Sequence, residues 1–192
     1  MGTQKLLLPF AGRTVIGHIA AQVLASPVDR TIIVVGHDAA AIKSALVGQS
    51  VEFVPNPDTE GDMLSSVRCG LRAVPVEIDA VLVVLGDQPS ITSELIRQLI
   101  EAGNAAGRSI IVPMHDGKTG HPLLFSTRYR EEILTGYDDV GLRGLLQAHA
   151  GDRLDVPVAS SSVLSDMDYP EDYRREVGAH LIPGPEGASR CR

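Results

Sequence analysis

Two hydrophobic patterns alternate along the chain. In the first, short runs rich in β-branched residues are largely apolar rather than alternating. They cover residues 31–35, 51–54, 80–85, 109–112 and 154–158. An uninterrupted run is typical of a strand covered on both faces, whereas a half-exposed strand alternates apolar and polar residues. These runs therefore predict the strands of a largely parallel sheet.

In the second pattern, apolar residues recur at helical spacing between those runs. In residues 14–24, Val15, Ile19 and Val23 fall on one stripe of a helix. Similar spacing occurs in residues 39–46, 92–102 and 141–149, and residues 170–177 begin with Pro-Glu-Asp, which suits the first turn of a helix. Strands that alternate with helices predict an α/β fold, a three-layer α/β/α sandwich with a mostly parallel sheet. In such sheets, ligands bind beyond the carboxyl ends of the strands.

The length and net charge of the chain limit its domain organisation and the classes of function that it can have. The 192 residues suit one domain, which we place at residues 1–177, with a flexible tail over 178–192 that has no periodicity. A net charge of −7 argues against sequence-independent binding of nucleic acid. No apolar run approaches the roughly 20 residues of a membrane span. With only two cysteines and no signal sequence, the expected location is the cytoplasm.

The first candidate for chemistry is Asp87, which follows Gly86 directly after the run 80–85. This position puts a carboxylate at the carboxyl edge of a strand. A carboxylate there suits Mg²⁺, which takes one or two protein oxygens and completes its shell with water and phosphate. The alternative is that Asp87 only closes the turn that Pro89 fixes.

Asp166 and Asp168 form a second acidic group near the end of the chain. On an extended segment, residues two apart share a face, so either carboxylate could join Asp87 at a metal ion. The alternative is that Asp168 or Tyr169 caps the helix beginning at Pro170.

The segment after the run 51–54 contains small polar residues at a predicted helix start. Gly61, Ser65 and Ser66 could bind a base or a phosphate there, because backbone N–H groups at a helix start attract anions. The alternative is a plain loop with serine capping, in which Arg68 is a solvated charge.

Two further residues are ambiguous on their own. His121 lies in a Gly-His-Pro turn and could face a pocket, although a lone histidine is more often a hydrogen-bonded turn residue; we assign no metal to it. Lys5 could equally be a surface lysine on a frayed terminus.

Taken in order, these residues resemble the MobA-like nucleotidyltransferase family, most closely its molybdenum cofactor cytidylyltransferase branch. The resemblance rests on Met1-Gly2-x-x-Lys5, Asn56-Pro57-Asp58, Leu64-Ser65-Ser66-Val67, Gly86-Asp87-Gln88-Pro89, Gly120-His121-Pro122-Leu123-Leu124 and Asp166-x-Asp168-x-Pro170-Glu171-Asp172. It covers residues 1 to about 177, and the Gly-His-Pro and C-terminal acidic motifs are its most specific parts.

The resemblance implies a Rossmann-like fold of the nucleotide-diphospho-sugar transferase type and a Mg²⁺-dependent reaction. A nucleoside monophosphate, usually CMP from CTP, would pass to the phosphate of molybdopterin with release of pyrophosphate. Proteins of molybdoenzyme maturation are possible partners. The implied roles are phosphate contact for Lys5, metal binding for Asp87 and Asp168 (or Asp166), base and ribose contact for Gly61, Ser65 and Ser66, and acceptor contact for His121.

The chain departs from the family pattern at two places. The family has a strand and a glycine-rich loop, Leu-Ala-Ala-Gly-x-Ser-x-Arg, before the Met-Gly motif, whereas this sequence begins at Met1. We favour a reading frame started too late over a truncated relative. Loss of that central strand would leave unpaired edges on both its neighbours. The second departure is Tyr169, where threonine is usual.

Other functions remain open. The acceptor could be another small phosphate ester, such as a sugar or polyol phosphate, and GTP could replace CTP. The chain could also be a non-catalytic nucleotide-binding or partner-binding module, because the phosphate loop is missing. A dinucleotide dehydrogenase is disfavoured, because no G-x-G-x-x-G follows a strand.

Overall fold

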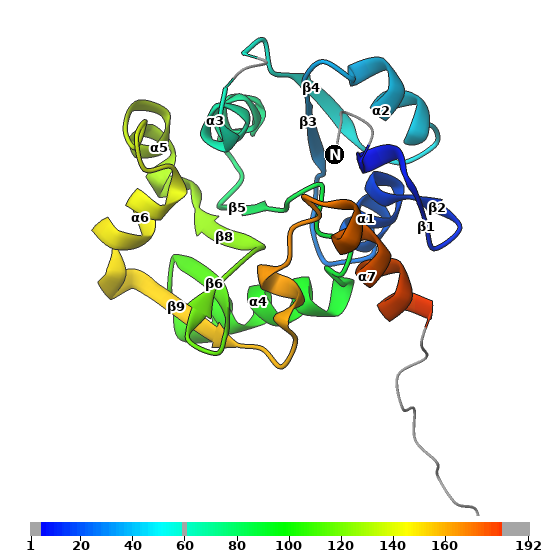
Figure 1. The fold of residues 1–192 in the computed structure, drawn as a ribbon. Helices are drawn as coiled ribbons and strands as arrows, with labels where there is room; N and C mark the ends of the chain where they lie inside the picture. The colour runs from blue at the N-terminus through cyan, green and yellow to red at the C-terminus, as the bar shows by residue number, and fades with distance from the viewer. Residues whose placement is uncertain (1–4, 59–60, 182–192) are drawn as a thin grey trace, which may run out of the picture.

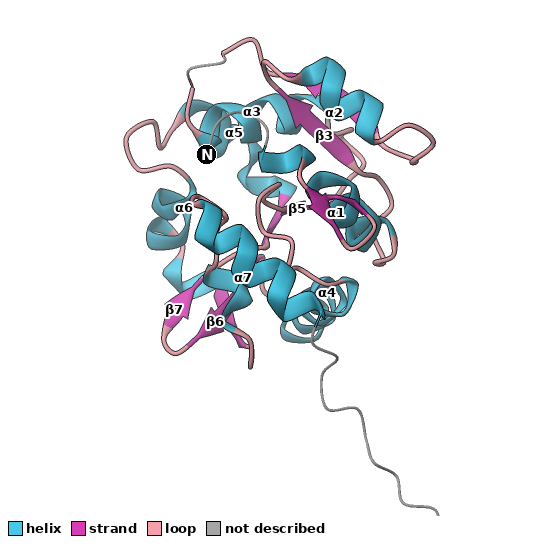
Figure 2. Cartoon of the chain, turned by 45° about the vertical axis from the view of Figure 1, so that its right-hand side comes forward, coloured by secondary structure: helices cyan, strands magenta, loops and turns pink. Residues whose placement is uncertain are grey.

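A computed structural model describes residues 5–58 and 61–181 and shows helices on both faces of a sheet (Figures 1 and 2). The strands are β1 (Pro9–Phe10), β2 (Arg13–Thr14), β3 (Ile32–Val35), β4 (Glu52–Pro55), β5 (Ala80–Val83), β6 (Ile110–His115), β7 (Lys118–Thr119), β8 (Leu123–Ser126) and β9 (Arg153–Pro157). The α-helices are α1 (Val15–Leu24), α2 (Ala39–Ala45), α3 (Met63–Ala73), α4 (Ser93–Ala106), α5 (Arg130–Thr135), α6 (Leu142–Ala148) and α7 (Pro170–Leu181). Short 3₁₀ turns include η1 (Lys5–Leu7), η2 (Thr127–Tyr129), η3 (Ala150–Asp152) and η4 (Ser161–Leu164).

The α/β prediction is confirmed, and the sheet is mixed rather than mostly parallel. β3 pairs with β4, and β6 with β9, in parallel, whereas β8 lies antiparallel between β5 and β6. The cause is the short connection between β6 and β8, which turns at Asp116 and Gly117, both with positive φ. A connection this short cannot make the crossover that a parallel neighbour needs. The sequence patterns had indicated no strand over residues 123–126.

The alternation of side chains along β8 shows the layers. Leu123 and Phe125 pack against α3, α5 and α6 on one face, whereas Leu124 packs against α4 on the other. Successive residues of a strand point to opposite faces, so a run that is apolar at every position needs both faces covered. The three-layer prediction is confirmed here.

The described strands do not form one continuous sheet. Within the described residues, β3 pairs only with β4 and β5 pairs only with β8, so the sheets that contain them do not join. Their apolar residues Val34 and Leu82 are only half-buried. Leu6 of η1 packs against the core beside β3.

The last helix is longer than predicted. α7 continues to Leu181, past the expected domain end at residue 177. The rest of the predicted tail, residues 182–192, lies outside the described residues. Within those described, no helix is long and apolar enough to cross a membrane.

Phe125 offers a test of the core. It is 0% exposed on β8, between Val81 of β5 and Ile110 of β6. We expect Phe125→Ala to lower the free energy of unfolding by about 3–5 kcal/mol, because it leaves a cavity that β-strands cannot close. Urea denaturation measures this loss. The control Val76→Ala, at a residue 86% exposed, should change stability by less than about 0.5 kcal/mol.

Candidate functional site

Two carboxylates from distant parts of the chain meet at one cation. The Lys5 ammonium donates to Asp87 Oδ2 at 2.7 Å and to Asp168 Oδ1 at 3.1 Å. Asp87 lies in the turn after β5, and Asp168 lies just before α7. The structure thus brings together three of the residues singled out in the sequence, and Lys5 is not a free surface lysine.

Backbone hydrogen bonds hold the two acidic segments side by side. The Met167 N–H donates to the Asp87 carbonyl at 3.2 Å, and the Met167 side chain is buried. The N–H groups of Asp168 and Tyr169 both donate to Asp172 Oδ2, at 3.2 and 2.9 Å. The Tyr169 N–H, followed by Arg175, holds the pKa of Asp172 below its usual range. Asp172, in the first turn of α7, thus accepts from the two N–H groups that precede the helix, and the Asp168 carboxylate reaches Lys5.

Asp166 has a different partner. The Gln88 amide donates to Asp166 Oδ1 at 2.6 Å, and Gln88 is only 2% exposed. This hydrogen bond joins the turn after β5 to the segment before α7. Among the two candidates for the second metal ligand, Asp168 is the one that shares a cation with Asp87. Sequence reasoning had overlooked Gln88, although it stands between Asp87 and Pro89.

The charges at this site suit a divalent cation. Partial burial pulls the pKa of Lys5 down, but the hydrogen bonds and charges of Asp87 and Asp168 outweigh it and raise that pKa above 10.5. At the position of the Lys5 ammonium, both carboxylates face a positive charge. Their side chains are 22% and 63% exposed, so water and phosphate oxygens can reach them. Two carboxylates completed by such oxygens are a ligand set that Mg²⁺ accepts.

This site is unlike a closed metal cage. In the described part of the chain, no group of three or more His, Cys, Asp or Glu side chains is placed to hold a metal ion. Zinc sites need three or four such protein ligands, whereas Mg²⁺ bound with a nucleotide takes most of its ligands from phosphate and water. The residues therefore fit Mg²⁺ or a similar oxygen-preferring ion.

The predicted nucleotide-contact residues gather at the start of α3. Asn56 donates from its amide to the hydroxyls of Ser65, at 2.7 Å, and Ser66, at 3.1 Å. The serine oxygens act as acceptors in these bonds, so each hydroxyl still carries a proton that it can donate. A side chain at residue 61 would collide with Ser65 and Asp58, so only glycine allows the backbone to lie this close to them.

Arg68 of α3 connects this helix to the end of α5. Its guanidinium donates to the carbonyl of Ile133 at 2.9 Å and that of Gly136 at 2.6 Å, and forms an ion pair with Asp138. These contacts tie α3 to the end of α5. The interpretation of Arg68 as a solvated charge was therefore wrong.

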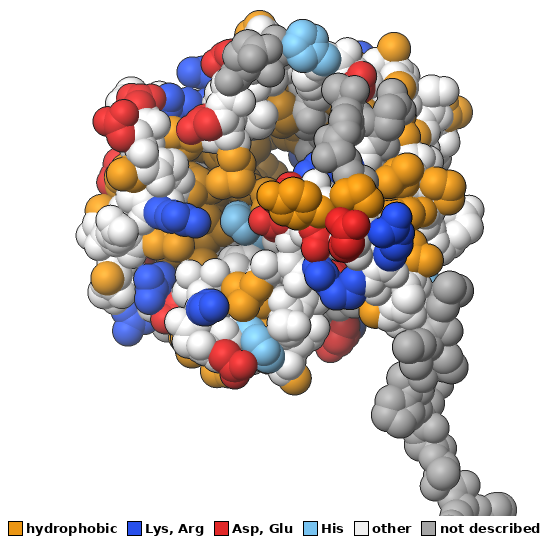
Figure 3. Space-filling model, viewed as in Figure 1, with side chains coloured by type: hydrophobic (Ala, Val, Ile, Leu, Met, Phe, Trp, Pro, Cys, Tyr) orange, Lys and Arg blue, Asp and Glu red, His pale blue; other side chains and the backbone are white. Residues whose placement is uncertain are grey.

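His121 lies among charges of both signs. Its N–H donates to the Val163 carbonyl at 3.0 Å, which fixes the turn before β8. Burial, helped by the charge of Arg143, lowers the pKa of His121, while Asp166 and Asp87 act in the opposite direction. The imidazole is therefore neutral at neutral pH. Figure 3 shows this face hollowed near its middle, with acidic, basic and histidine side chains at the hollow.

Comparison with known proteins identifies the class. The model of the MobA-like NTP transferase domain matches residues 1–154, so the chain belongs to that family of nucleotidyltransferases. The structure of Rv0371c from Mycobacterium tuberculosis H37Rv is similar, with a TM-score of 0.82 and 28% identity over 93% of this chain and 90% of that one. A structure of Rv0371c in complex with manganese gives a TM-score of 0.79 and 27% identity over 92% of each chain.

A functionally described relative is also similar. The molybdenum cofactor cytidylyltransferase of Escherichia coli (strain K12) is 26% identical over 174 residues, which are 90% of this chain and 86% of the relative. The chain is thus a transferase enzyme of the MobA-like family, with a molybdenum cofactor cytidylyltransferase among its homologues.

The Gln88–Asp166 contact can be tested by adding a charge. We expect Gln88→Glu to lower stability by roughly 3 kcal/mol at pH 8, because two carboxylates would then face each other in a largely buried place. The pair would share a proton, so its folded-state pKa would lie above its unfolded value. Stability should therefore return as the pH falls toward 5.

Urea denaturation at pH 8 and pH 5 measures this difference. Gln147→Glu, at an exposed position on α6, is the matched control. A Gln88→Glu loss that is equal at both pH values would contradict the proposed contact.

Proposed function

We propose that this protein transfers CMP from CTP to the phosphate of a molybdopterin-type acceptor and releases pyrophosphate, with Mg²⁺ as cofactor. The observation that carries the proposal is the meeting of Asp87 and Asp168 at the Lys5 ammonium. Family membership supports nucleotidyl transfer. The named activity of the E. coli relative supports this donor and acceptor.

The residues present suit this chemistry. Nucleotidyl transfer needs in-line geometry and positive charge near the developing negative charge more than it needs a protein nucleophile. Asp87 and Asp168 would hold Mg²⁺, which supplies charge neutralisation to the triphosphate when bound. Lys5, charged at neutral pH, would contact the phosphates. The hydroxyls of Ser65 and Ser66 would contact the base or ribose.

The acceptor phosphate is itself the nucleophile. Its oxygen forms a bond to the α-phosphorus of CTP, and the bond from that phosphorus to the bridging oxygen of pyrophosphate breaks. The electron pair leaves with pyrophosphate. No proton has to move if the acceptor reacts as its dianion, so the site needs no Ser-His-Asp array.

Calorimetric titration with Mg-CTP and Mg-GTP tests the donor. We expect tighter binding of Mg-CTP and loss of CMP transfer by at least 100-fold in Asp87→Asn, because the metal loses a charged ligand. Asp29→Asn, at an exposed aspartate, is the control. Equal turnover in Asp87→Asn and Asp29→Asn would rule out the proposed activity.

Two further experiments test the other interpretations of the sequence. Turnover screens with sugar and polyol phosphates test whether the acceptor differs. The same titration on a chain preceded by the glycine-rich segment of the family measures what that segment adds to nucleotide affinity.

Removal of the Lys5 charge should affect free metal and nucleotide in opposite directions. In the absence of nucleotide, the ammonium competes with a divalent ion for Asp87 and Asp168, so we expect Lys5→Met to bind Mn²⁺ roughly tenfold more tightly. The same variant should bind Mg-CTP more weakly, because a phosphate contact is lost. Electron paramagnetic resonance of free Mn²⁺ and calorimetry measure these two changes. Weaker binding of Mn²⁺ alone in Lys5→Met would contradict the shared site.

A further inference from the structure

Asn56 joins the end of β4 to the start of α3 through its side-chain amide. Its amino group donates to the hydroxyl oxygens of Ser65 and Ser66, at 2.7 and 3.1 Å. Its carbonyl oxygen accepts from the Asp58 N–H at 3.0 Å and from the Cys69 thiol at 3.4 Å. Both protons and both lone pairs of the amide are thereby used, in a residue that is only 8% exposed.

The neighbours of this amide determine which way round it lies. A backbone N–H can only donate, so the atom that faces the Asp58 N–H has to be the oxygen, and the amino group has to face the serines. The backbone of Asn56 is held as well, because its N–H donates to the Val35 carbonyl at 2.8 Å and Pro57 restricts the residue before it to extended conformations. The direction of the amino group is therefore set by the fold.

The helix that carries the serines is fixed relative to Asn56. The Asp62 carboxylate caps α3 by accepting from the Ser65 N–H at 3.0 Å. About one turn further along the helix, Arg68 holds α3 to two backbone carbonyls near the end of α5. The position of each serine is therefore fixed, and only its hydroxyl can turn.

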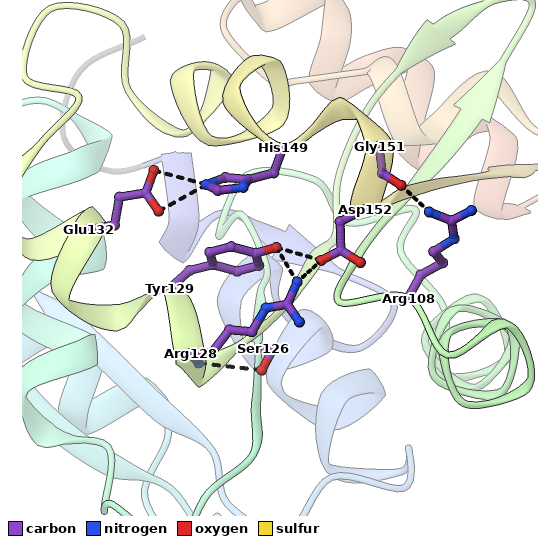
Figure 4. Close-up of polar contacts among 8 residues, drawn as sticks. All are labelled: Arg108, Ser126, Arg128, Tyr129, Glu132, His149, Gly151 and Asp152. Atoms are coloured by element: carbon purple, nitrogen blue, oxygen red, sulfur yellow. Dashed lines mark hydrogen bonds and ion pairs between the residues drawn. The ribbon is translucent and has the colours of Figure 1, made fainter.

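The helix α5 is in turn part of a larger unit (Figure 4). The ring of His149, at the end of α6, makes contacts of 2.9 and 3.0 Å with the two carboxylate oxygens of Glu132 on α5. The centroid of the Tyr129 ring lies 4.5 Å from that of His149, and the Tyr129 hydroxyl donates to Asp152 in η3. Through α5, the helix α3 is thus attached to an assembly that also includes α6 and η3.

The charges at the start of α3 favour a neutral part of a ligand. Asp62 caps the helix, and Asp58 lies beside Gly61, where a side chain would collide with it. Both carboxylates are exposed. Negative charge repels a phosphate at this place. Of the base and the phosphate that the sequence left open as ligands of the serines, the base therefore fits better.

We propose that Asn56 is a positioning residue that fixes the Ser65 and Ser66 hydroxyls as donors to the nucleotide base and so selects cytosine. This inference rests on the proposed function and concerns the base of its donor nucleotide. An oxygen that accepts from the amide directs its own O–H away from Asn56 and leaves it for the ligand. Two neighbouring donors match two neighbouring acceptors, and N3 and O2 of cytosine form such a pair.

Uracil is the most informative competitor, because it differs from cytosine at few atoms. Its N3 carries a proton, which would face a serine O–H instead of an acceptor. The serine could accept that proton only by turning its own O–H elsewhere, which leaves a hydrogen bond unmade. Guanine likewise presents N–H groups, at N1 and N2. A site built on hydrogen bonds discriminates strongly against a ligand that leaves them unpaired.

Reversal of the polarity of the amide tests this role. In Asn56→Asp, the carboxylate can still accept from the Asp58 N–H and the Cys69 thiol, but it accepts from the two serine hydroxyls instead of donating to them. The hydroxyl protons are then withdrawn from the base. We expect the preference for Mg-CTP over Mg-UTP, measured by calorimetry at pH 8, to fall at least about tenfold. The added charge repels both triphosphates alike, so its effect cancels in this ratio.

Asn104→Asp is the matched control, because it makes the same substitution at an exposed position on α4. It should leave the ratio unchanged, and thermal melting checks that each variant folds. A ratio in Asn56→Asp that equals that of the control would overturn the assignment. An equal loss of affinity for both nucleotides would do the same, because general damage to the fold produces such a loss.

A second variant keeps Asn56 as it is. Ser65→Ala combined with Ser66→Ala removes both hydroxyls and should lower the same ratio. Adding Asn56→Asp should then change it no further, because the residue has no hydroxyl left to orient. An unchanged preference for Mg-CTP in the serine double variant would overturn the inference even if Asn56→Asp failed to fold. A further fall on adding Asn56→Asp would overturn it as well.

Turnover separates this inference from the proposed function. CMP transfer by the parent protein, with equal affinity for Mg-CTP and Mg-UTP or with a preference that does not depend on Asn56, would reject the inference and leave the function standing. A preference for Mg-CTP that depends on Asn56, without CMP transfer to any phosphate acceptor, would reject the function and support the inference.

Discussion

The convergence of Asp87 and Asp168 is the constraint on which the candidate site depends. Two carboxylates repel one another unless a cation lies between them, and here the Lys5 ammonium does so. Neutral donors also hold the two segments together: the Met167 N–H and the Gln88 amide join them by hydrogen bonds without adding charge. The two segments that carry the carboxylates are thus also joined by hydrogen bonds that do not involve the cation.

The mixed sheet explains why these residues meet. β8 returns antiparallel between β5 and β6, so the turn before β8, with His121, is brought to the end of β5 where Asp87 lies. The register pairs Val83 with Leu123, which leaves Asp87 and His121 beyond the same end of the two strands. An antiparallel neighbour thereby supplies a side chain to a site that an all-parallel sheet would build from strand ends alone.

Local signals in the sequence were sufficient for much of this architecture. Gly86 and Asp87 after an apolar run located a carboxylate at a strand end, and the helical spacing over residues 92–102 located α4, where the Thr92 hydroxyl accepts from the Leu95 N–H. β8 was missed because its apolar residues follow a Gly-His-Pro turn, and a run this short does not distinguish a strand from a buried loop.

Contacts between distant residues were beyond the reach of such signals. Gln88 and Asp166 are 78 positions apart, and no spacing rule connects an amide in one turn to a carboxylate in another. The choice between Asp166 and Asp168 was likewise open, because both lie on one short segment and only the fold shows which one faces Lys5.

Within the described residues, β3 and β5 each hydrogen-bond to a strand on one side only. Backbone N–H and C=O groups left unpaired along a strand are a general template for pairing with a further strand. The net charge of −7 keeps copies apart at low ionic strength. Salt screens that repulsion but hardly weakens strand pairing. A higher ionic strength should therefore favour association of copies in concentrated solution.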